Sequence, residues 1–444
     1  MLKSRKSKVK PALPAGFRDF GPTEVKRRRA IINKLASLFE LYGYEPLETP
    51  AVELLSVLGG KYGDEGDKLL FRILNSGDFL SGVPTEAQQS AHTLLPYITE
   101  KALRYDLTVP MARWIAQHAG ELVFPFKRYQ IQPVWRADRP QRGRFREFYQ
   151  CDIDIIGGEG ILPLVEIIHV VRKGLEAIGI RGAIFHLNHR LLLEKAAEEI
   201  GWPSQKFNEF CTLLDKTDKI GWENVKKHFS ELGFSLPTWL APEGEVLSTA
   251  LETQLQSMPE TVSDLPIILS LITTKDEIME VRWDATLARG LDYYTGYIYE
   301  VKLPENNIGS IGAGGAYASL VGDFGGPELP AIGFSFGIER ILTILQDNIA
   351  ETTNLPVLVA WIDASPTYIM RVIEELHDKG IPAFPYPSPR KLSRQLDYAQ
   401  RRGFEWVIIL GTAEESTSTV QLKNLKTHTQ HLLPLNELAA ALRN

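Results

Sequence analysis

The spacing of apolar residues divides the first part of the chain into helical and strand segments. In residues 24–42, apolar positions recur at helical intervals with a charged opposite face, which predicts an amphipathic helix that stops at Gly43. Residues 121–156 contain two hydrophobic strand patterns separated by the polar sequence RPQRGR, which predicts an antiparallel hairpin. Residues 160 to about 280 are mostly amphipathic and helical, and we interpret at least their later part as an insertion.

The rest of the chain returns to strands. The sequence IGSIGAGGAYASLVGDFGG predicts strands and glycine-rich turns, and SFGIERILTILQDNI predicts a helix. Near residues 354–356 the pattern changes, and the buried strands PVLVAWID and EWVIILG then alternate with the helix PTYIMRVIEELHDKG. The chain is therefore predicted to have an α+β antiparallel core, a helical insertion and a C-terminal α/β module.

Residues 287–300, LARGLDYYTGYIYE, combine a strand pattern with an unusual polar content. The composition favours a β-strand, and period-two alternation would place Tyr293 and Tyr294 on opposite faces beside Arg289. A buried tyrosine must still satisfy its hydroxyl, whereas a strand built only for packing would use Val and Ile. This segment is therefore a candidate binding surface for a small polar molecule.

Length and composition limit the domain count and the class of protein. A chain of 444 residues is longer than a single hydrophobic core usually accommodates, so two or three domains are expected. The two cysteines, Cys151 and Cys211, lie far apart in sequence, which does not support a disulfide framework and fits a reducing cytoplasm. No apolar run reaches the ~20 residues that span a bilayer. Residues 1–10 are basic without an apolar core, so they form either a solubilising tail or an arm that contacts phosphates.

The formal net charge of −6 argues against a protein coated with basic residues for nonspecific nucleic-acid binding. Local basic patches remain open, because phosphate attraction acts within roughly a Debye length of ~8 Å at physiological salt. The chain has no GxxxxGK[ST] phosphate loop, and no GxGxxG lies between a strand and a helix. Any nucleotide bound here would be held without the usual loop-and-helix cradle.

Isolated arginines are the first chemical candidates. Arg136 lies on an apolar strand with Asp138 on the same face, where it could grip a phosphate or form only a surface pair with Asp138. Arg340 follows the small-residue strand AIGFSFG and could either bind a ligand or close its helix. Together with Arg289 they would stabilise charge that develops during displacement at a nucleotide phosphorus, with Mg²⁺ held largely by the phosphates.

Acidic and amide side chains are the second set of candidates. Gln150, Asp152 and Asp154 alternate on one strand face, which suits either an ammonium group or a solvent-facing edge. Asp106 and Thr108 in the sequence RYDLTVP could bind an amine or begin the following helix. No His/Cys cluster has metal-ligand spacing and no Ser/His/Asp trio stands out, so the chemistry is predicted to depend on arginines.

These segments together resemble the histidyl-tRNA synthetases, a family of class II aminoacyl-tRNA synthetases. The resemblance covers nearly the whole chain, with RGLDYYTG as its most specific motif, WRADRP…RFREF similar to the second class II motif and GFSFGIERI similar to the third. It implies a six-stranded antiparallel sheet flanked by helices. The implied segments are a basic arm at 1–10, a catalytic core at 11–180 and 282–350, a helical insertion domain at 181–281, and an anticodon-binding α/β domain at 355–444.

The resemblance also implies roles for individual residues. Arg136 would hold the α-phosphate of ATP, Asp138 would lie near the adenine, Arg340 would grip the γ-phosphate, and Arg289 would lie between the histidine carboxylate and the α-phosphate. The residues implied to bind L-histidine are Asp106, Thr108, Gln150, Asp154, Arg289, Tyr293 and Tyr294. The residues implied to contact tRNA(His) are Gln141, Arg142, Arg144, Arg390, Lys391 and Arg394.

The implied reaction joins L-histidine to tRNA(His) at the expense of ATP with Mg²⁺, through attack of the histidine carboxylate on the α-phosphorus. The family further implies a cytoplasmic homodimer whose interface uses residues near 31 to 55. One departure is visible: the usual Gly-Gly-Arg-Tyr-Asp turn reads GGAYASL, so that Ala316 and Ala318 replace an arginine and an aspartate. Loss of both charges leaves no unpaired partner.

Two other interpretations stay open. The first is a regulatory subunit of ATP phosphoribosyltransferase, which resembles a synthetase and senses histidine without charging tRNA. Such subunits typically lack the C-terminal domain and often lose arginines of the ATP site, whereas this chain has the domain and retains Arg136, Arg289 and Arg340. The second is a synthetase relative without activity, an interpretation that rests on Ala316 and Ala318.

Overall fold

The protein forms two compact units, residues 1–348 and 349–444. The computed structural model describes residues 11–62, 66–141, 143–242, 267–268, 276–288, 293–304, 308–345 and 356–443. The predictions for the arm at 1–10, for Arg142 and for Arg289 therefore lie outside the described residues.

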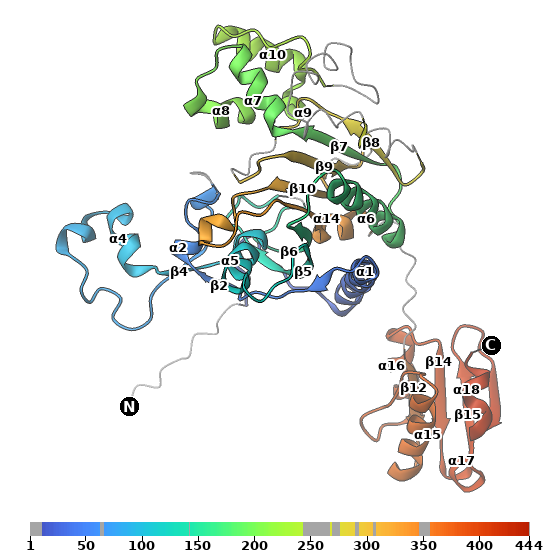
Figure 1. Ribbon diagram of the computed structural model, residues 1–444. Helices are drawn as coiled ribbons and strands as arrows, with labels where there is room; N and C mark the ends of the chain where they lie inside the picture. The colour runs from blue at the N-terminus through green and yellow to red at the C-terminus, as the bar shows by residue number, and fades with distance from the viewer. Residues whose placement is uncertain are drawn as a thin grey trace. The chain divides into compact units, whose positions relative to one another are not determined.

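The larger unit is built on an eight-stranded sheet in the order β1-β5-β6-β11-β10-β9-β7-β8 (Figure 1). The six strands β5, β6, β11, β10, β9 and β7 each pair antiparallel with the next in this order. At the two edges, β1 pairs parallel with β5 and β8 pairs parallel with β7. The prediction of a six-stranded antiparallel core is therefore confirmed. The strands are β1 (Glu45–Pro46), β5 (Phe126–Trp135), β6 (Glu147–Ile156), β7 (Ala183–His189), β8 (Met279–Trp283), β9 (Tyr297–Lys302), β10 (Gly312–Tyr317) and β11 (Ala331–Gly337).

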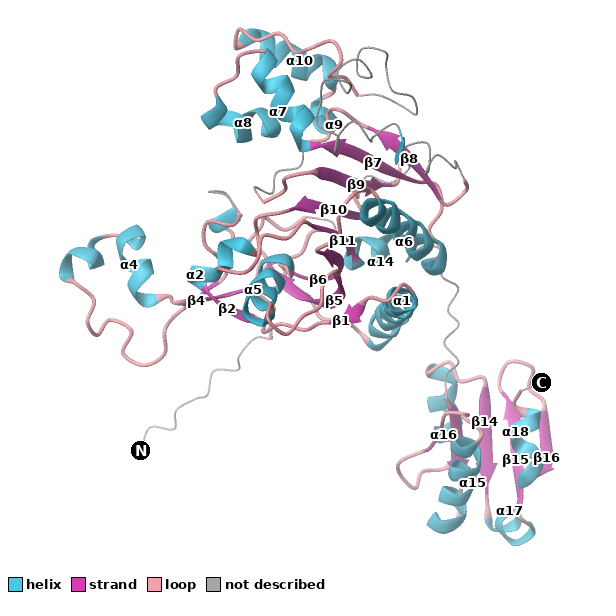
Figure 2. Ribbon diagram, viewed as in Figure 1, coloured by secondary structure: helices cyan, strands magenta, loops and turns pink. Residues whose placement is uncertain are grey.

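Helices cover one face of this sheet. Helix α1 (Pro22–Leu41) confirms the predicted amphipathic segment and ends just before Gly43, which takes φ +78°. It packs against α6 (Leu162–Ile178), and both α6 and α14 (Ile338–Leu345) contact β11 (Figure 2). Apolar side chains of alternate positions on β6 and β11, including Ile153 and Phe336, are buried in this layer. The opposite positions of the same strands point to the other face.

The predicted hairpin is confirmed by β5 and β6, which pair antiparallel so that Arg128 lies opposite Asp154. A small three-stranded sheet in the order β2-β4-β3 leads into α5, which carries the next functional segment. Its elements are β2 (Val52–Leu54), α2 (Leu55–Leu58), β3 (Arg72–Ile73), η1 (Thr85–Gln89), α4 (Ala91–Ile98), β4 (Lys101–Leu103) and α5 (Thr108–His118).

The segment expected as the insertion begins with a strand of the main sheet. Both β7 and most of β8 fall within residues 181–281, and β7 pairs with β9. A short buried strand cannot be separated from a buried helix by periodicity alone, and this ambiguity obscured the boundary. We therefore propose that the helical insertion starts after His189. Its described helices are α7 (Arg190–Glu199), η2 (Ser204–Lys206), α8 (Phe207–Leu214), α9 (Thr217–Ile220) and α10 (Trp222–Glu231).

The strand expected over residues 287–300 is shorter than predicted, since β9 begins only at Tyr297. Before it, the backbone N–H groups of Thr295 and Gly296 donate to the carbonyl oxygen of Ala316 at 2.9 and 3.3 Å. Tyr293 and Tyr294 therefore precede the strand rather than alternate within it. The strand propensity of this segment predicts a regular ladder, but two successive N–H groups donate to the same β10 carbonyl instead.

The C-terminal unit confirms the predicted α/β module. Its five-stranded sheet has the order β13-β12-β14-β15-β16, parallel among the first three strands and antiparallel from β14 to β16. Its elements are β12 (Val357–Trp361), α15 (Pro366–Asp378), β13 (Ala383–Pro385), α16 (Leu392–Arg401), β14 (Trp406–Leu410), α17 (Thr412–Thr417), β15 (Thr419–Asn424), β16 (Gln430–Pro434), η4 (Leu435–Glu437) and α18 (Leu438–Ala441). Across the described parts of both units, no helix combines the length and apolarity that a membrane span requires.

Candidate active site

The sheet face opposite α6 carries buried polar side chains, and we call it the polar face. The β5–β6 register places Arg128 opposite Asp154 and Gln130 opposite Asp152, and all four side chains are buried. On the next strand, Gly333 lies opposite Asp154, and a methyl group there would come within 1.9 Å of Asp154 Oδ1. The alternative that Gln150, Asp152 and Asp154 form a solvent-facing edge is therefore wrong for both aspartates, which are buried, while Gln150 is half-buried.

Asp154 is held by two partners that come from other strands. Arg128 Nη2 lies 2.7 Å from Asp154 Oδ2, and the arginine side chain is completely buried. The Tyr317 hydroxyl donates to Asp154 Oδ1 at 2.5 Å. Arg128 was missed from the sequence, although an arginine inside the apolar strand FKRYQIQPVW is itself a signal, because a buried arginine needs a partner.

Asp106 gathers a second group of donors. Its Oδ1 accepts a hydrogen bond from the Tyr62 hydroxyl at 2.9 Å and another from the Val109 backbone N–H at 3.1 Å, while Oδ2 accepts from the Tyr293 hydroxyl at 3.4 Å. Tyr293 also forms a hydrogen bond with Thr108. Asp106 thus both fixes the start of α5 and joins a buried cluster, so the two interpretations are compatible. Tyr62 was missed, because no local pattern links it to Asp106.

Tyrosine rings close around these carboxylates. The ring of Tyr293 lies 4.9 Å from that of Tyr294 and 6.0 Å from that of Tyr317, measured between centroids. All three side chains are buried. A methyl group on Gly315 would lie 2.6 Å from Tyr294 Cδ1, so the absence of a side chain on β10 leaves room for this ring. The aromatic groups and the carboxylates therefore form one compact cluster.

Gln150, Ser335 and Asp152 form a short chain of hydrogen bonds on the polar face. Gln150 Nε2 donates to Ser335 Oγ at 3.3 Å, and the serine is hydrogen-bonded to Asp152. Within the described structure, Gln150 Oε1 and Asp152 Oδ1 are both buried atoms without a hydrogen-bond partner. Two buried acceptor oxygens on the polar face are thus without a donor.

Burial governs the titration of this cluster. It raises the pKa of Asp152 to about 7 and that of Asp154 to about 6, while attraction to Arg128 lowers both. Burial also raises the pKa of Asp106, against the hydrogen bond from Val109 and attraction to Arg136. Burial therefore disfavours the ionised form of all three carboxylates in this cluster.

The raised pKa values predict a pH-dependent stability. Between about pH 4 and pH 7 the folded state binds more protons than the unfolded state, so the free energy of unfolding falls as the pH rises. Asp152→Asn removes one contributor. We expect this variant to melt at a higher temperature than the wild type at about pH 8, with the gain shrinking towards about pH 5. Thermal unfolding at the two pH values measures this, and a lower Tm of the variant at the higher pH would contradict it.

Arg136 lies beside the same cluster. Its Nε donates to the Tyr105 carbonyl oxygen at 3.0 Å, and its guanidinium carbon lies 4.3 Å from the centroid of the Tyr105 ring and 5.2 Å from that of Phe148. This hydrogen bond to a described residue uses only Nε of Arg136. Its two Nη groups can therefore bind a ligand. Tyr105 immediately precedes Asp106, and the charge of Arg136 lowers the pKa of Asp106.

Asp138 pairs with Arg144 and not with Arg136. Arg144 Nε lies 3.1 Å from Asp138 Oδ2 and its Nη2 lies 2.9 Å from Oδ1, a two-point contact between the ends of the loop. The interpretation of an Arg136–Asp138 surface pair is therefore wrong. Gln141 and Arg144 also exchange backbone hydrogen bonds, which makes a tight turn that presents the exposed Gln141 side chain.

Arg340 reaches towards this loop from α14. Its Nη1 donates to the Ser310 carbonyl oxygen at 2.5 Å. A methyl group on Gly143 would lie 3.8 Å from Arg340 Cγ, so the loop and the helix meet closely. The structure thus places Arg340 beside the loop that Asp138 and Arg144 close, and Arg136 lies directly before this loop in the sequence.

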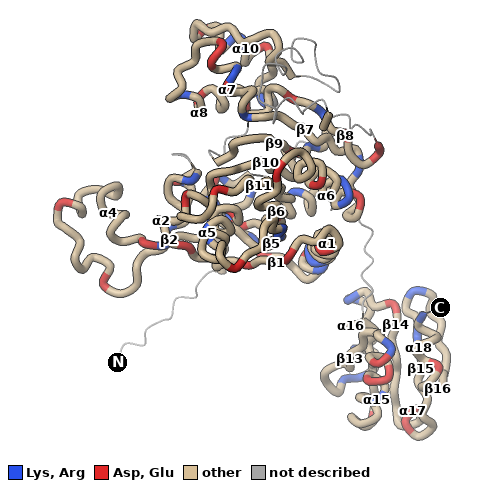
Figure 3. The backbone as a smooth tube through the Cα atoms, in the orientation of Figure 1, with Lys and Arg blue, Asp and Glu red and all other residues tan. Residues whose placement is uncertain are grey.

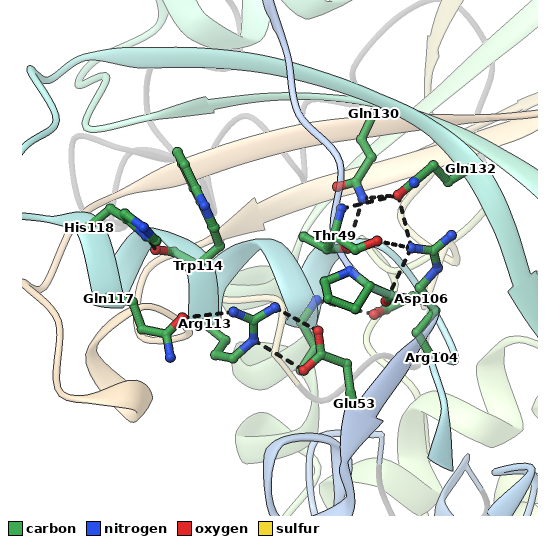
Figure 4. A network of polar contacts seen from close by, with 12 residues as sticks. Thr49, Glu53, Arg104, Asp106, Arg113, Trp114, Gln117, His118, Gln130 and Gln132 are labelled. Carbon is green, nitrogen blue, oxygen red and sulfur yellow. Dashed lines mark hydrogen bonds and ion pairs between the residues drawn. The ribbon is translucent and has the colours of Figure 1, made fainter. Parts of the chain in front are cut away.

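A polar network beyond these residues was not predicted (Figure 4). Gln130 Nε2 donates to Thr49 Oγ1 at 2.9 Å and to Gln132 Oε1 at 2.7 Å. Arg104 Nη1 donates to the same Gln132 oxygen at 2.9 Å and to the Thr49 carbonyl oxygen at 2.6 Å. These bonds tie the segment after α1 to β5 and thereby fix the strand that carries Arg128.

Arg390, Lys391 and Arg394 are exposed around the start of α16, and Figure 3 marks lysine and arginine positions in blue. The completely buried Gln395 donates to the Arg390 carbonyl oxygen at 2.7 Å and to the Trp361 carbonyl oxygen at 2.8 Å. The backbone that carries these three basic side chains is therefore held in place by the hydrogen bonds of Gln395.

Ala316, which stands where the family usually has arginine, does not displace the neighbouring Tyr317. Ala316 lies on β10 with its carbonyl bound by Thr295 and Gly296, and Tyr317 still reaches Asp154. Over the described residues, no group of three or more His, Cys, Asp or Glu side chains is arranged to hold a metal ion.

Comparison with known proteins agrees with this architecture. The family model described as histidyl-tRNA synthetase matches residues 16–83 and 79–341, and that of an anticodon-binding domain matches residues 356–444. The histidine–tRNA ligases of Christiangramia forsetii and Bacteroides fragilis are each 40% identical to this chain, and each match covers 98% of this chain and 99% of the relative.

Solved structures give the same result. The histidyl-tRNA synthetase of Nostoc sp. PCC 7120 superposes with a TM-score of 0.77 at 27% identity, covering 98% of this chain and 99% of that one. A Bacillus halodurans protein titled as an ATP phosphoribosyltransferase regulatory subunit/histidyl-tRNA synthetase shares the fold, with a TM-score of 0.71 at 18% identity over 91% of this chain and 100% of that one. The chain belongs to the histidyl-tRNA synthetase family.

Proposed function

We propose that this protein is an ATP-dependent histidine–tRNA ligase, which activates L-histidine as its adenylate and transfers it to the 3′ end of tRNA(His). The observation that carries the proposal is the convergence of two carboxylate clusters, around Asp106 and Asp154, through the contact of Tyr293 with Tyr317, with Arg136 hydrogen-bonded to Tyr105, the residue before Asp106. This arrangement supports a site for a cationic, hydrogen-bonding amino acid next to a phosphate.

L-Histidine fits the polar face. Asp106, Thr108, Gln150 and Asp154 would bind its α-amino group and nearby polar atoms, and the rings of Tyr293 and Tyr294 would frame the imidazole. Hydroxyl groups that address both imidazole nitrogens would reject analogues without them by roughly 10⁴-fold or more, because the buried polar groups would be left unpaired.

ATP would lie along the arginines. Arg136 would hold the α-phosphate with its Nη groups, Arg340 would contact the γ-phosphate, and Asp138 would approach the adenine. Mg²⁺ would be bound chiefly by the phosphate oxygens, since Mg²⁺ normally keeps water and phosphate ligands. We propose Arg289 as the group between the histidine carboxylate and the α-phosphate.

The chemistry needs no protein nucleophile. A carboxylate oxygen of histidine attacks the α-phosphorus, the bond to the β-phosphate bridging oxygen breaks, and pyrophosphate leaves with the electron pair. A terminal ribose hydroxyl of the tRNA then attacks the adenylate carbonyl, loses its proton and displaces AMP. Juxtaposition of the reactants and fixed positive charge at Arg136 would supply most of the acceleration.

We also propose the finer organisation that the family suggests. The catalytic core would comprise 11–180 and 282–350 with β7 added, residues 355–444 would bind the anticodon, and residues 31–55 would contribute to a homodimer interface. The expected compartment is the cytoplasm. A regulatory role without tRNA charging is less well supported, because the chain keeps Arg136, Arg340 and a folded C-terminal α/β unit.

Charging of tRNA(His) tests the proposal. The full chain should transfer radiolabelled L-histidine to a tRNA(His) transcript in the presence of ATP and Mg²⁺, and should leave a transcript specific for another amino acid uncharged. Adenylate formation without charging would support a synthetase relative that has lost transfer. Binding of histidine without either reaction would support the regulatory interpretation.

The basic residues at α16 give a separate prediction. Arg390→Glu, Lys391→Glu and Arg394→Glu together should raise the KM for tRNA(His) about tenfold or more, since lost and reversed phosphate contacts weaken nucleic-acid binding. Histidine-dependent pyrophosphate exchange should be unchanged, because it needs no tRNA. The matched control is Lys423→Glu on β15. An equal effect of the control, or none from the triple variant, would contradict the assignment.

A further inference from the structure

We propose that residues 14–20, the segment before α1, hold the loop between β5 and β6 in position for ATP and are therefore positioning residues for adenylate formation. We call this segment the strap. The inference rests on the proposed function and extends it, because that function places Arg136 and Asp138 against the nucleotide. The strap would thus belong to the nucleotide site, although it lies more than a hundred residues before that loop in the sequence.

Arg146, immediately before β6, joins the strap to the loop. Its backbone N–H donates to the Gly16 carbonyl oxygen at 2.9 Å, and its Nη1 donates to the Ala15 carbonyl oxygen at 3.3 Å. Arg146 Nε donates to the Asp138 carbonyl oxygen at 3.0 Å, and the Arg146 carbonyl oxygen accepts from the Arg136 N–H at 2.9 Å. One residue therefore connects the strap with both Arg136 and Asp138.

A tight turn brings the backbone of the strap against the loop. The Phe17 N–H donates to the Pro14 carbonyl oxygen at 3.2 Å, and Gly16 occupies the third position of this turn with φ +84°. Glycine adopts this conformation without the strain that a side chain would introduce. A methyl group on Gly16 would also lie 2.8 Å from Arg146 Cγ and 2.9 Å from Pro140 Cγ. An added side chain would therefore push the strap and the loop apart.

A second set of contacts ties the strap to β6 and α1. The Arg18 guanidinium carbon lies 4.3 Å from the centroid of the Phe145 ring and 4.2 Å from that of Phe20. The Arg28 guanidinium carbon, on α1, lies 4.2 Å from the Phe20 centroid and 4.6 Å from that of Tyr149. Phe20 thus contacts two guanidinium groups, an arrangement that cation–π attraction favours. These contacts hold the second half of the strap beside the end of the loop.

The contacts of the strap predict an effect on the nucleotide and not on the amino acid. Arg146, which the strap holds, is bonded to Asp138 and to the backbone of Arg136. The carboxylates of Asp106 and Asp154, proposed to bind histidine, are instead hydrogen-bonded by tyrosine hydroxyls. A displaced loop would therefore misplace the groups proposed to bind ATP while the histidine cluster keeps its own partners.

Kinetics of histidine-dependent pyrophosphate exchange by the full chain test the inference. Gly16→Ala should raise the KM for ATP about tenfold or more, because misplaced groups lose much of their effect, and should change the KM for L-histidine less than about twofold. The matched control is Gly179→Ala at the end of α6, where φ is +83° and a methyl group would meet no described atom within 4 Å. It introduces similar backbone strain away from the loop, so both KM values should stay at the wild-type level.

Phe20→Leu is a second variant, which introduces no backbone strain and decides the question if Gly16→Ala does not fold. It should raise the KM for ATP about threefold or more, because it removes the ring between the two guanidinium groups. The conservative variant Phe20→Tyr keeps an aromatic ring and should restore the wild-type KM for ATP.

The outcomes separate the inference from the proposed function. A rise in KM that is equal for ATP and L-histidine, or that Gly179→Ala reproduces, would show a merely structural role and overturn the inference. An unchanged KM for ATP in Gly16→Ala would overturn it as well, while exchange by the wild type would leave the proposed function intact. Absence of exchange by the wild type would instead remove the proposed function and the inference with it.

Discussion

Arg136→Ala should reduce the rate of histidyl-adenylate formation by about 10³-fold or more, because a fixed guanidinium that meets charge developing on a transferring phosphoryl group is worth that much in related chemistry. The structure supports this size of effect. Arg136 is oriented by a hydrogen bond to Tyr105 and by two aromatic rings, so little reorganisation is needed when ATP binds.

Pre-steady-state quench of pyrophosphate release measures this rate, and equilibrium binding of ATP separates it from affinity. We expect the loss to fall mainly on the rate, since the interaction strengthens in the transition state. Arg139→Ala, at an exposed position of the adjoining loop, is the matched control and should be nearly silent. A comparable loss in ATP affinity and rate would show that Arg136 provides only ground-state binding.

Arg128→Ala should destabilise the larger unit by about 3–5 kcal/mol, the usual cost of leaving one member of a buried ion pair alone. Arg128 is completely buried and lies 2.7 Å from Asp154, whose other oxygen is bound by Tyr317. Without the guanidinium, Asp154 would lose the attraction that lowers its pKa and would take up a proton more readily. Histidine affinity should fall as well.

Urea unfolding of the full chain measures the stability change in the transition of the larger unit. The double variant Arg128→Met, Asp154→Asn should recover much of the stability, because it removes both charges, but it should not recover histidine binding. Arg181→Ala, in an exposed pair with Glu277, is the matched control and should change stability by less than about 1 kcal/mol. An equally small change for Arg128→Ala would contradict the importance of the buried pair.

The sequence was informative wherever one period dominated. The helix of α1, the β5–β6 hairpin and the alternation of the C-terminal unit follow from spacing alone, because a wrong period would expose a whole apolar face. The shared face of Gln150, Asp152 and Asp154 was likewise predictable. The burial of Asp152 and Asp154 was not, since period-two alternation does not say which face another part of the chain will cover.

The residues that sequence reasoning missed depend on distant partners. Arg128 meets Asp154 only because of the hairpin register, and Tyr62 meets Asp106 through contacts that no local pattern encodes. The prediction of a strand over residues 287–300 was wrong in its extent because local propensity was followed where a contact with another strand decides. Local strand propensity was high, but the backbone of Thr295 and Gly296 is held by Ala316 before β9 begins.

Histidine-dependent exchange of radiolabelled pyrophosphate into ATP tests the central claim most directly, because it requires the amino acid, the nucleotide and their correct juxtaposition but no tRNA. The wild-type chain should catalyse exchange that saturates with L-histidine and is absent with other amino acids. Binding of L-histidine without any exchange at saturating histidine, ATP and Mg²⁺ would contradict the claim that the polar face and Arg136 form one catalytic site.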